Sequence, residues 1–152
     1  MQKDNSNSNS NSMQLKFKAL SANEAFARVA VAAFATQLNP TLAELTEVKT
    51  AVSEAVTNSI IHGYEMNGQC EVEITCSMIG RQLTIEIKDT GHGIDDIDKA
   101  KEPLYTSKPD MERSGMGFTI MDEFMDGLDI ISSPGEGTTI KMLKTFGEAS
   151  DE

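Results

Sequence analysis

The sequence predicts a two-layer α/β sandwich of the α+β class, in which helices cover one face of a mixed, mostly antiparallel sheet. The chain has 152 residues, the usual size of a single domain. Segments with strand and helix periodicity follow one another in the order βααββαββ. Residues 70–78 and 82–89 are separated only by Ile79-Gly80-Arg81, which indicates an antiparallel hairpin. Strands and helices in this order form a sheet that is covered on one face.

The first strand is expected at residues 13–19, where apolar and polar side chains alternate. Residues 5–12, just before it, alternate strictly between Asn and Ser. They have no apolar side chain whose burial would offset the entropy of ordering. We therefore expect residues 1–12 to be a disordered leader.

Two helices should follow, each opening on a capping box, in which the first residue and the fourth cap each other's backbone N–H groups. Ser21 and Glu24 precede a helical pattern that ends before Asn39-Pro40. Thr41 and Glu44 open a second helix that runs to residue 63. Its apolar positions recur at helical spacing: Leu45, Val48, Val52, Ala55, Val56 and Ile60.

After the hairpin, residues 94–115 are charged, contain two prolines and show no sustained periodicity. We expect a long functional loop there. Residues 117–125 predict a short helix, and residues 128–132 and 138–144 predict two strands around a Pro134-Gly135 turn.

Composition excludes several classes of protein. Thirteen Lys and Arg against twenty-four Asp and Glu give a net charge of −11, which disfavours direct nucleic-acid binding. The longest apolar run, residues 29–35, is too short to cross a bilayer, and no secretion signal is visible, so we expect a cytoplasmic protein. Cys70 and Cys76 lie in one predicted strand, too far apart to form a disulfide, and no CxxC or HxxxH spacing indicates a structural metal site.

Glu54 and Asn58 lie four residues apart on the second helix, so their side chains share one face, with His62 one turn further on. A carboxylate in this position can act as a general base, and an amide oxygen can be offered to a hard cation such as Mg²⁺. A solvated helix face commonly carries the same residues, so this pair alone does not define a site.

Two motifs fall at strand ends. Asp89, Gly91 and Gly93 form a DxGxG sequence, whose glycines permit the close approach of a flat ligand, although an ordinary turn uses the same residues. Gly137 precedes Thr138 and Thr139 at the start of the last strand. Thr138 shares a face with the apolar residues of that strand and is the better ligand candidate.

The sequence Ser114-Gly115-Met116-Gly117 precedes a helix, so free backbone N–H groups and the positive end of the helix dipole could hold phosphate oxygens. Four basic residues lie in the loop before it: Lys99, Lys101, Lys108 and Arg113. In an acidic chain this is where an anion would bind, although a solvated loop of mixed charge would look alike. No Walker, GxGxxG or eukaryotic kinase motif is present.

Taken together, the order and spacing of these motifs resemble the ATP-binding boxes of the GHKL superfamily, which groups gyrase, heat-shock chaperones, histidine kinases and mismatch-repair ATPases. Two stretches, EVKTAVSEAVTNSIIHGY at residues 47–64 and PLYTSKPDMERSGMGFTIMDEFMD at residues 103–126, resemble the anti-sigma F factors of endospore-forming bacteria. The resemblance covers residues 13–146 and leaves a tail at 147–152. It implies the Bergerat ATP-binding fold.

The resemblance also implies roles for the site residues, with ATP and Mg²⁺ as cofactors. Glu54 would activate the attacking hydroxyl, Asn58 would ligate Mg²⁺, and Asp89 would accept the adenine amino group. An acceptor at that position favours adenine over guanine. The remaining candidates would contact the nucleotide: Gly91, Gly93, Lys108, Arg113, Ser114, Gly115, Gly117 and Thr138.

The implied function is that of a serine/threonine-protein kinase and anti-sigma factor that inhibits a sporulation sigma factor. Its substrate would be an anti-anti-sigma protein, and it would act as a homodimer, with Arg28 as a secondary candidate for sigma contact. The alternative is a nucleotide-dependent sigma-binding module without significant turnover. The presence of Glu54 favours the kinase, because a degenerate site would lose its base first.

Overall fold

A computed structural model describes residues 10–63, 70–91, 117–132 and 134–147 of the chain. Five strands form one sheet in the order β1-β2-β3-β5-β4. Their bounds are β1 (Ser10–Lys18), β2 (Glu71–Ile79), β3 (Gln82–Asp89), β4 (Gly127–Ser132) and β5 (Thr138–Thr145). All four pairings are antiparallel. The predicted two-layer class is therefore confirmed.

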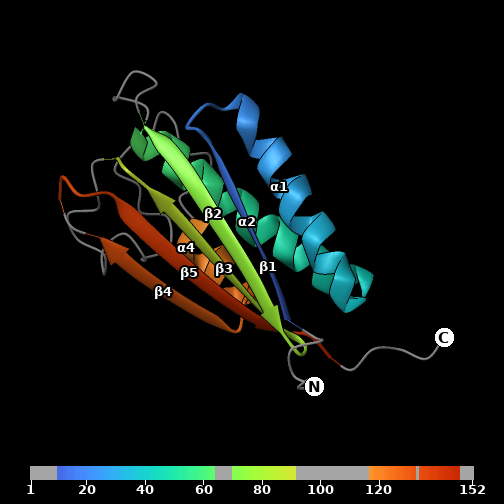
Figure 1. The fold of residues 1–152 in the computed structure, drawn as a ribbon. Helices are drawn as coiled ribbons and strands as arrows, with labels where there is room; N and C mark the ends of the chain where they lie inside the picture. The colour runs from blue at the N-terminus through green and yellow to red at the C-terminus, as the bar shows by residue number, and fades with distance from the viewer. Residues whose placement is uncertain (1–9, 64–69, 92–116, 133, 148–152) are drawn as a thin grey trace, which may run out of the picture.

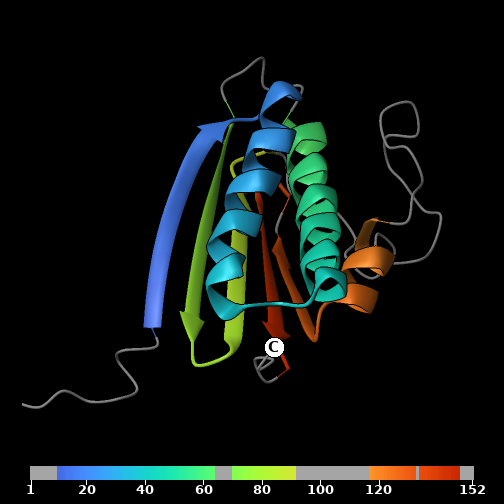
Figure 2. The same cartoon turned by 90° about the vertical axis from the view of Figure 1, so that its right-hand side faces the viewer.

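Three helices lie against one face of this sheet (Figures 1 and 2). They are α1 (Ala22–Ala35), α2 (Leu42–Gly63) and α4 (Gly117–Phe124), and a short 3-10 helix, η2 (Thr36–Leu38), follows α1. Asn39 has a left-handed backbone, φ 50°, which ends η2 before Pro40. No helix in the described part of the chain is long and apolar enough to span a bilayer.

The two predicted capping boxes have different outcomes. Thr41 and Glu44 form theirs: the N–H of Thr41 donates to Glu44 Oε1 at 2.9 Å, and the N–H of Glu44 donates to Thr41 Oγ1 at 3.0 Å. Ser21 makes no side-chain cap, because its own backbone is helical, with φ −53° and ψ −34°. Glu24 is engaged elsewhere, since its Oε2 accepts from Ser53 Oγ on α2 at 2.6 Å. The prediction of a box at Ser21 was wrong.

Strand β1 begins at Ser10, three residues before the predicted start, so the end of the predicted leader belongs to the sheet. The reason is long-range pairing, because β2 continues to Ile79 and offers Ser10 a backbone partner. The predicted loop 94–115 lies outside the described residues.

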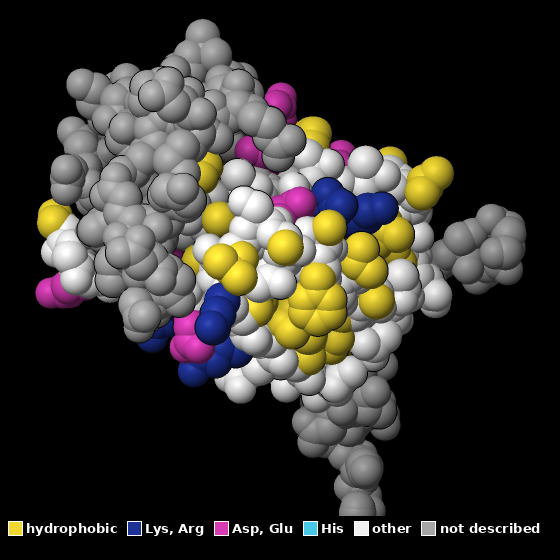
Figure 3. Space-filling model, turned by 90° about the horizontal axis from the view of Figure 1, so that it is seen from above, with side chains coloured by type: hydrophobic (Ala, Val, Ile, Leu, Met, Phe, Trp, Pro, Cys, Tyr) yellow, Lys and Arg dark blue, Asp and Glu magenta, His cyan; other side chains and the backbone are white. Residues whose placement is uncertain are grey.

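Helix α1 leaves an apolar face unpaired. Phe26 is 55% exposed and Val29 is 59% exposed, while Ala27 and Val31 on the opposite face are buried. In the space-filling view of Figure 3, hydrophobic side chains gather in a patch on the described surface. An uncovered apolar helix face is typical of a surface that binds another molecule.

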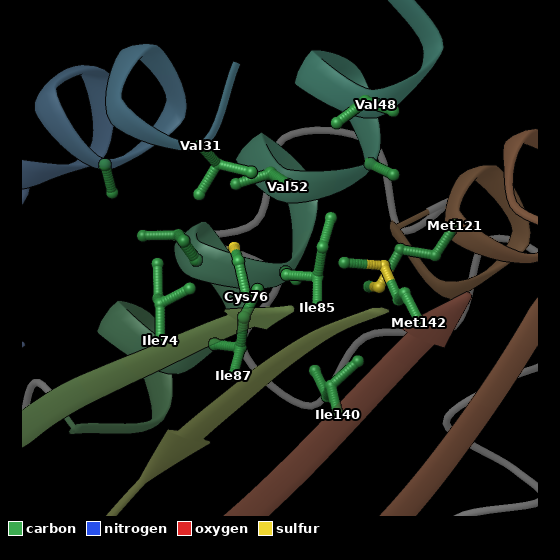
Figure 4. Close-up of a cluster of buried hydrophobic side chains, with 14 of the residues drawn as sticks. Val31, Val48, Val52, Ile74, Cys76, Ile85, Ile87, Met121, Ile140 and Met142 are labelled. Carbon is green, nitrogen blue, oxygen red and sulfur yellow. The ribbon is translucent and has the colours of Figure 1, made fainter. Parts of the chain in front are cut away.

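The core lies between the sheet and the helices (Figure 4). The inward residues of β3 and β5 alternate with outward polar ones and pack beneath α2. The largest fully buried side chains include Val31, Val48, Val52, Ile74, Ile85, Ile87, Met121, Ile140 and Met142. Each contributes about 1.5–3 kcal/mol when fully buried. Both cysteines are free and buried, and burial raises the pKa of Cys76 to about 12.

Candidate functional site

Four elements bring four of the described candidate residues together in two contacts. Asp89, at the end of β3, pairs in register with Thr138, at the start of β5. Glu54, on α2, lies against Gly117, the first residue of α4. The sequence order of these residues does not reveal either contact, because each joins segments far apart in the chain.

At the strand contact, the backbones of Gly137 and Asp89 approach closely. Gly137 has φ 84°, and a Cβ added there would lie 2.2 Å from the carbonyl oxygen of Asp89. Only glycine fits, because any other residue would carry that Cβ. Ser132 Oγ lies 2.8 Å from Thr138 Oγ1, which ties β4 to the same corner. Thr138 is 2% exposed and faces inward.

Asp89 is buried, at 1% exposure, and its two carboxylate oxygens differ in their hydrogen bonding. Oδ1 accepts the backbone N–H of Gly91 at 2.9 Å, which explains the DxG spacing as a local turn. Oδ2 has no hydrogen-bond partner among the described residues. Burial raises the pKa of Asp89, and the N–H of Gly91 opposes this by favouring the charged form. Within the described part of the chain, Oδ2 is therefore a buried acceptor without a donor.

Ser59 is a site residue that sequence reasoning missed. It is fully buried on α2, next to Asn58. Ser59 and the backbone of Thr138 lower the pKa of Asp89 from nearby, which places Ser59 beside that carboxylate, although its hydroxyl does not meet hydrogen-bond geometry with it. The available signal was a hydroxyl in an apolar stripe, because Val52, Ala55 and Val56 surround position 59 at helical spacing.

Three buried side-chain atoms in the described part of the chain have no hydrogen-bond partner: Asn58 Nδ2, Ser59 Oγ and Asp89 Oδ2. All three belong to α2 or to the end of β3. Leaving a buried polar group unpaired costs about 1–3 kcal/mol, so three in one region indicate a ligand that would satisfy them. Together they offer an amide, a hydroxyl and a carboxylate, which are groups that recognise a polar heterocycle.

The helix contact supplies a second chemical group. A Cβ added to Gly117 would lie 3.3 Å from Glu54 Oε1, so the first turn of α4 lies directly against this carboxylate. Glu54 is half-buried and has a partner of its own. A partly desolvated carboxylate at a helix N-terminus is suited to accept a proton near an anionic ligand.

Several candidates are not placed by this geometry. Gly93, Lys108, Arg113, Ser114 and Gly115 lie outside the described residues, as does the side chain of His62. Arg28 lies on α1, which carries none of the other candidates, and its Nη1 donates to Glu24 Oε2 at 3.3 Å.

Comparison with known proteins places the chain in a family. Residues 17–144 match the family model for the histidine kinase-like ATPase domain. The anti-sigma F factor of Oceanobacillus iheyensis is 58% identical over 133 residues, which cover 88% of this chain and 91% of that protein. The anti-sigma F factor of Clostridium acetobutylicum is 58% identical over 137 residues, which cover 90% of this chain and 94% of that protein.

Solved structures share the fold at low sequence identity. The RsbU and RsbW domains of a Mycobacterium tuberculosis protein superpose with a TM-score of 0.65 at 14% identity, over 90% of this chain and 32% of that one. The catalytic domain of the histidine kinase ThkA gives a TM-score of 0.54 at 14% identity, over 88% of this chain and 96% of that one. With this fold, a matching ATPase domain and relatives at this identity, the chain belongs to the anti-sigma F factor family of histidine kinase-like ATPases.

Proposed function

We propose that this anti-sigma factor is an ATP-dependent serine protein kinase, which inhibits a sporulation sigma factor and phosphorylates an anti-anti-sigma protein on serine. The observation that carries the proposal is a set of three buried polar atoms on α2 and β3 that have no partner among the described residues, together with the Glu54 carboxylate of α2, which lies against the start of α4. The kinase domain would cover residues 13–146, extended by the start of β1 at Ser10, and would be followed by a short tail at 147–152.

In this proposal Asp89 selects adenine over guanine as the nucleotide base. Its Oδ2, which no described residue contacts by a hydrogen bond, would accept one from the exocyclic amino group of adenine, while Oδ1 stays bound to the N–H of Gly91. Guanine presents a carbonyl at the same position, and an acceptor facing an acceptor would leave both unpaired, at about 1–3 kcal/mol. Ser59 and Thr138, both buried beside Asp89, would complete the polar contacts of the base.

Glu54 would act as the general base in phosphoryl transfer. The serine hydroxyl of the protein substrate gives its proton to the Glu54 carboxylate as its oxygen bonds to the γ-phosphorus. The bond between the γ-phosphorus and the bridging oxygen breaks, and ADP leaves. Such transfer depends mainly on positioning and on neutralising charge. The phosphates would lie at the N-terminus of α4, with Lys108, Arg113, Ser114 and Gly115 as further contacts.

The residues present fit a magnesium ion. Asn58 has an amide whose Nδ2 has no partner among the described residues, and rotating that amide by 180° presents its oxygen instead. When bound, Mg²⁺ would neutralise charge on the phosphate oxygens. Asn58, one turn from Glu54 on the same helix face, would hold it.

The partners would bind away from the nucleotide. We propose that the sigma contact is on α1, which carries both Arg28 and the exposed apolar residues Phe26 and Val29. The protein would act as a homodimer in the cytoplasm. The alternative function, a nucleotide-dependent sigma-binding module without turnover, uses the same site without the chemistry of Glu54.

The decisive experiment is phosphate labelling with γ-labelled ATP, Mg²⁺ and the anti-anti-sigma protein. We expect label on a serine of that protein. Glu86→Gln, on the outer face of β3, is a matched control that should keep wild-type labelling. ATP binding without label on the partner would support the binding module, and release of free phosphate alone would indicate an ATPase instead.

A further inference from the structure

Lys144 is the only buried basic residue in the described part of the chain, with 8% of its side chain exposed. On β5 it continues the inward face of Thr138, Ile140 and Met142, where the alternation calls for an apolar side chain. Burying an ammonium group is costly unless it is paired and hydrogen-bonded. The position therefore needs a reason other than core packing.

The contacts of Lys144 join three elements. Its Nζ donates to the carbonyl oxygen of Phe124, the last residue of α4, at 2.8 Å, and to Glu47 Oε1 on α2 at 2.9 Å. The last carbonyls of a helix have no partner within the helix and carry its negative dipole end, so a cation there is favourable. Lys144 thus ties the end of α4 to β5 and to α2.

The first residue of α4 contacts α2 directly, and the last is linked to α2 through Lys144. Gly117 lies against Glu54, and Phe124 is linked through Lys144 to Glu47. Glu54 follows Glu47 by seven residues on α2, and Phe124 follows Gly117 by seven residues on α4, so the two spans are equal. Each span rises about 10.5 Å at about 1.5 Å per residue. The two helices therefore run antiparallel, and fixing one end of α4 along its axis also fixes the other.

We propose that Lys144 is a positioning residue that sets the register of α4 along α2, and thereby the distance between the first turn of α4 and Glu54. It acts from the far end of the helix and touches neither nucleotide nor substrate. Its role in transfer rests on the proposed function, whereas the anchoring of α4 does not. The base-binding end of the site, on β3 and β5, does not depend on this anchor.

The first test measures α4 itself, without nucleotide. Lys144→Met keeps the length of the side chain but removes the donor, and the exposed Lys141→Met on the same strand is the matched control. We expect amide hydrogen exchange across residues 118–124 to accelerate about tenfold in Lys144→Met, as for loss of a hydrogen bond to a charged group, and to stay at the wild-type rate in Lys141→Met. Wild-type exchange in Lys144→Met would overturn the anchor.

The second test separates the two ends of the site with ATP and adenosine as probes. Lys144→Met should weaken ATP binding and lower kcat for transfer, on the order of 100-fold for a displacement of about 1 Å, while adenosine affinity stays unchanged. Lys144→Arg should restore much of both, since Arg can donate to the same two oxygens. Equal losses for ATP and adenosine would mean a general structural defect and would overturn the positioning role.

A third variant distinguishes positioning from stability. Glu47→Leu/Lys144→Met removes both charges together, so that neither the buried Lys144 nor the 40% exposed Glu47 is left without its partner. We expect wild-type thermal stability with the weakened ATP binding retained; recovery of ATP binding together with stability would overturn the inference. Failure of the wild-type chain to bind ATP would overturn the proposed function, and the exchange experiment would still decide whether Lys144 anchors α4.

Discussion

The two ends of the candidate site are built on different principles. At the β3–β5 end, position is set by backbone: Gly137 approaches the carbonyl oxygen of Asp89 so closely that no Cβ fits between them. At the α2–α4 end, position is set by side chains, since Glu54 lies against Gly117 and Lys144 holds the far end of the helix. A sheet ladder is rigid, whereas a short helix held at its ends can shift along its neighbour.

This difference fits the work proposed for each end. Recognition of the adenine ring needs a fixed pattern of hydrogen-bond donors and acceptors, which strand ends provide with little adjustment. Phosphoryl transfer needs a part that moves when substrate arrives and product leaves. We therefore expect substitutions at the strand end to act on binding and stability, and those at the helix end to act on catalysis.

The largest effect should come from Glu54→Gln. The amide keeps the shape of the side chain against Gly117 but cannot take a proton, so transfer should fall by about 10²–10⁴-fold. Mg²⁺-ATP binding, measured by calorimetry, should remain near wild type. Single-turnover phosphorylation of the anti-anti-sigma protein measures the loss, and near-normal transfer would remove Glu54 from its role.

Gly137→Ala should destabilise the fold by at least about 2 kcal/mol, because left-handed backbone strain adds to a clash with Asp89. Gly135 is a matched control, with φ 80° and no atom within 4 Å of an added Cβ. Gly135→Ala should cost only the backbone strain, about 1–2 kcal/mol. Denaturant unfolding of the two variants measures the difference. An equal loss of unfolding free energy in both would show that the close approach of Gly137 to Asp89 does not affect stability.

Asp89→Asn should weaken ATP binding by about 5–150-fold, the loss expected when a donor faces the adenine amino group in place of an acceptor. The same variant should be more stable than wild type at pH 7 without nucleotide. Burial raises the pKa of Asp89, so keeping it ionised in the folded state costs stability at neutral pH, and Asn removes that cost.

The sign of this effect can be checked by pH. As pH falls through the raised pKa of Asp89 towards its ordinary value of 3.8, the wild-type carboxyl becomes protonated in the fold and its cost disappears. The stability advantage of Asp89→Asn should therefore shrink with falling pH. Thermal unfolding of both proteins between pH 7 and pH 4 measures it, and a gap that widens on acidification would contradict the assignment.

The smallest effects should come from two serines on α2. Ser59 Oγ has no partner among the described residues, whereas Ser53 Oγ donates to Glu24 Oε2 at 2.6 Å. Ser59→Ala should stabilise the nucleotide-free protein by up to about 1 kcal/mol and weaken adenosine binding, and Ser53→Ala should destabilise it by a similar amount. Both changes gain the same helix propensity, so any difference between them comes from the hydrogen bonds. We expect the free energy of unfolding to rise for Ser59→Ala and to fall for Ser53→Ala. If both variants lower the free energy of unfolding, the Ser59 hydroxyl has a hydrogen-bond partner in the folded protein.

The secondary-structure elements and the fold class were predictable from the amino-acid sequence. Strand and helix periodicities are local, because they reflect which side chains of one segment face the core, and they predicted five strands and three helices within a few residues of their bounds. The capping box of Thr41 and Glu44 was predictable for the same reason, since both partners lie within one turn. The motif residues Glu54, Asn58, Asp89, Gly117 and Thr138 could be named, and their roles remain predictions.

The partners of these residues were not predictable from the sequence, because they depend on contacts between distant segments. Glu24 leaves the cap at Ser21 because Ser53, 29 residues away, offers a better-placed donor. Ser59 and Lys144 interrupt the apolar stripes of α2 and β5. Hydrophobic periodicity alone cannot distinguish a polar residue that the core tolerates from one that binds a ligand or positions a helix. Their neighbours come from segments far apart in the chain, and the energy of a buried polar group depends on those neighbours rather than on its own segment.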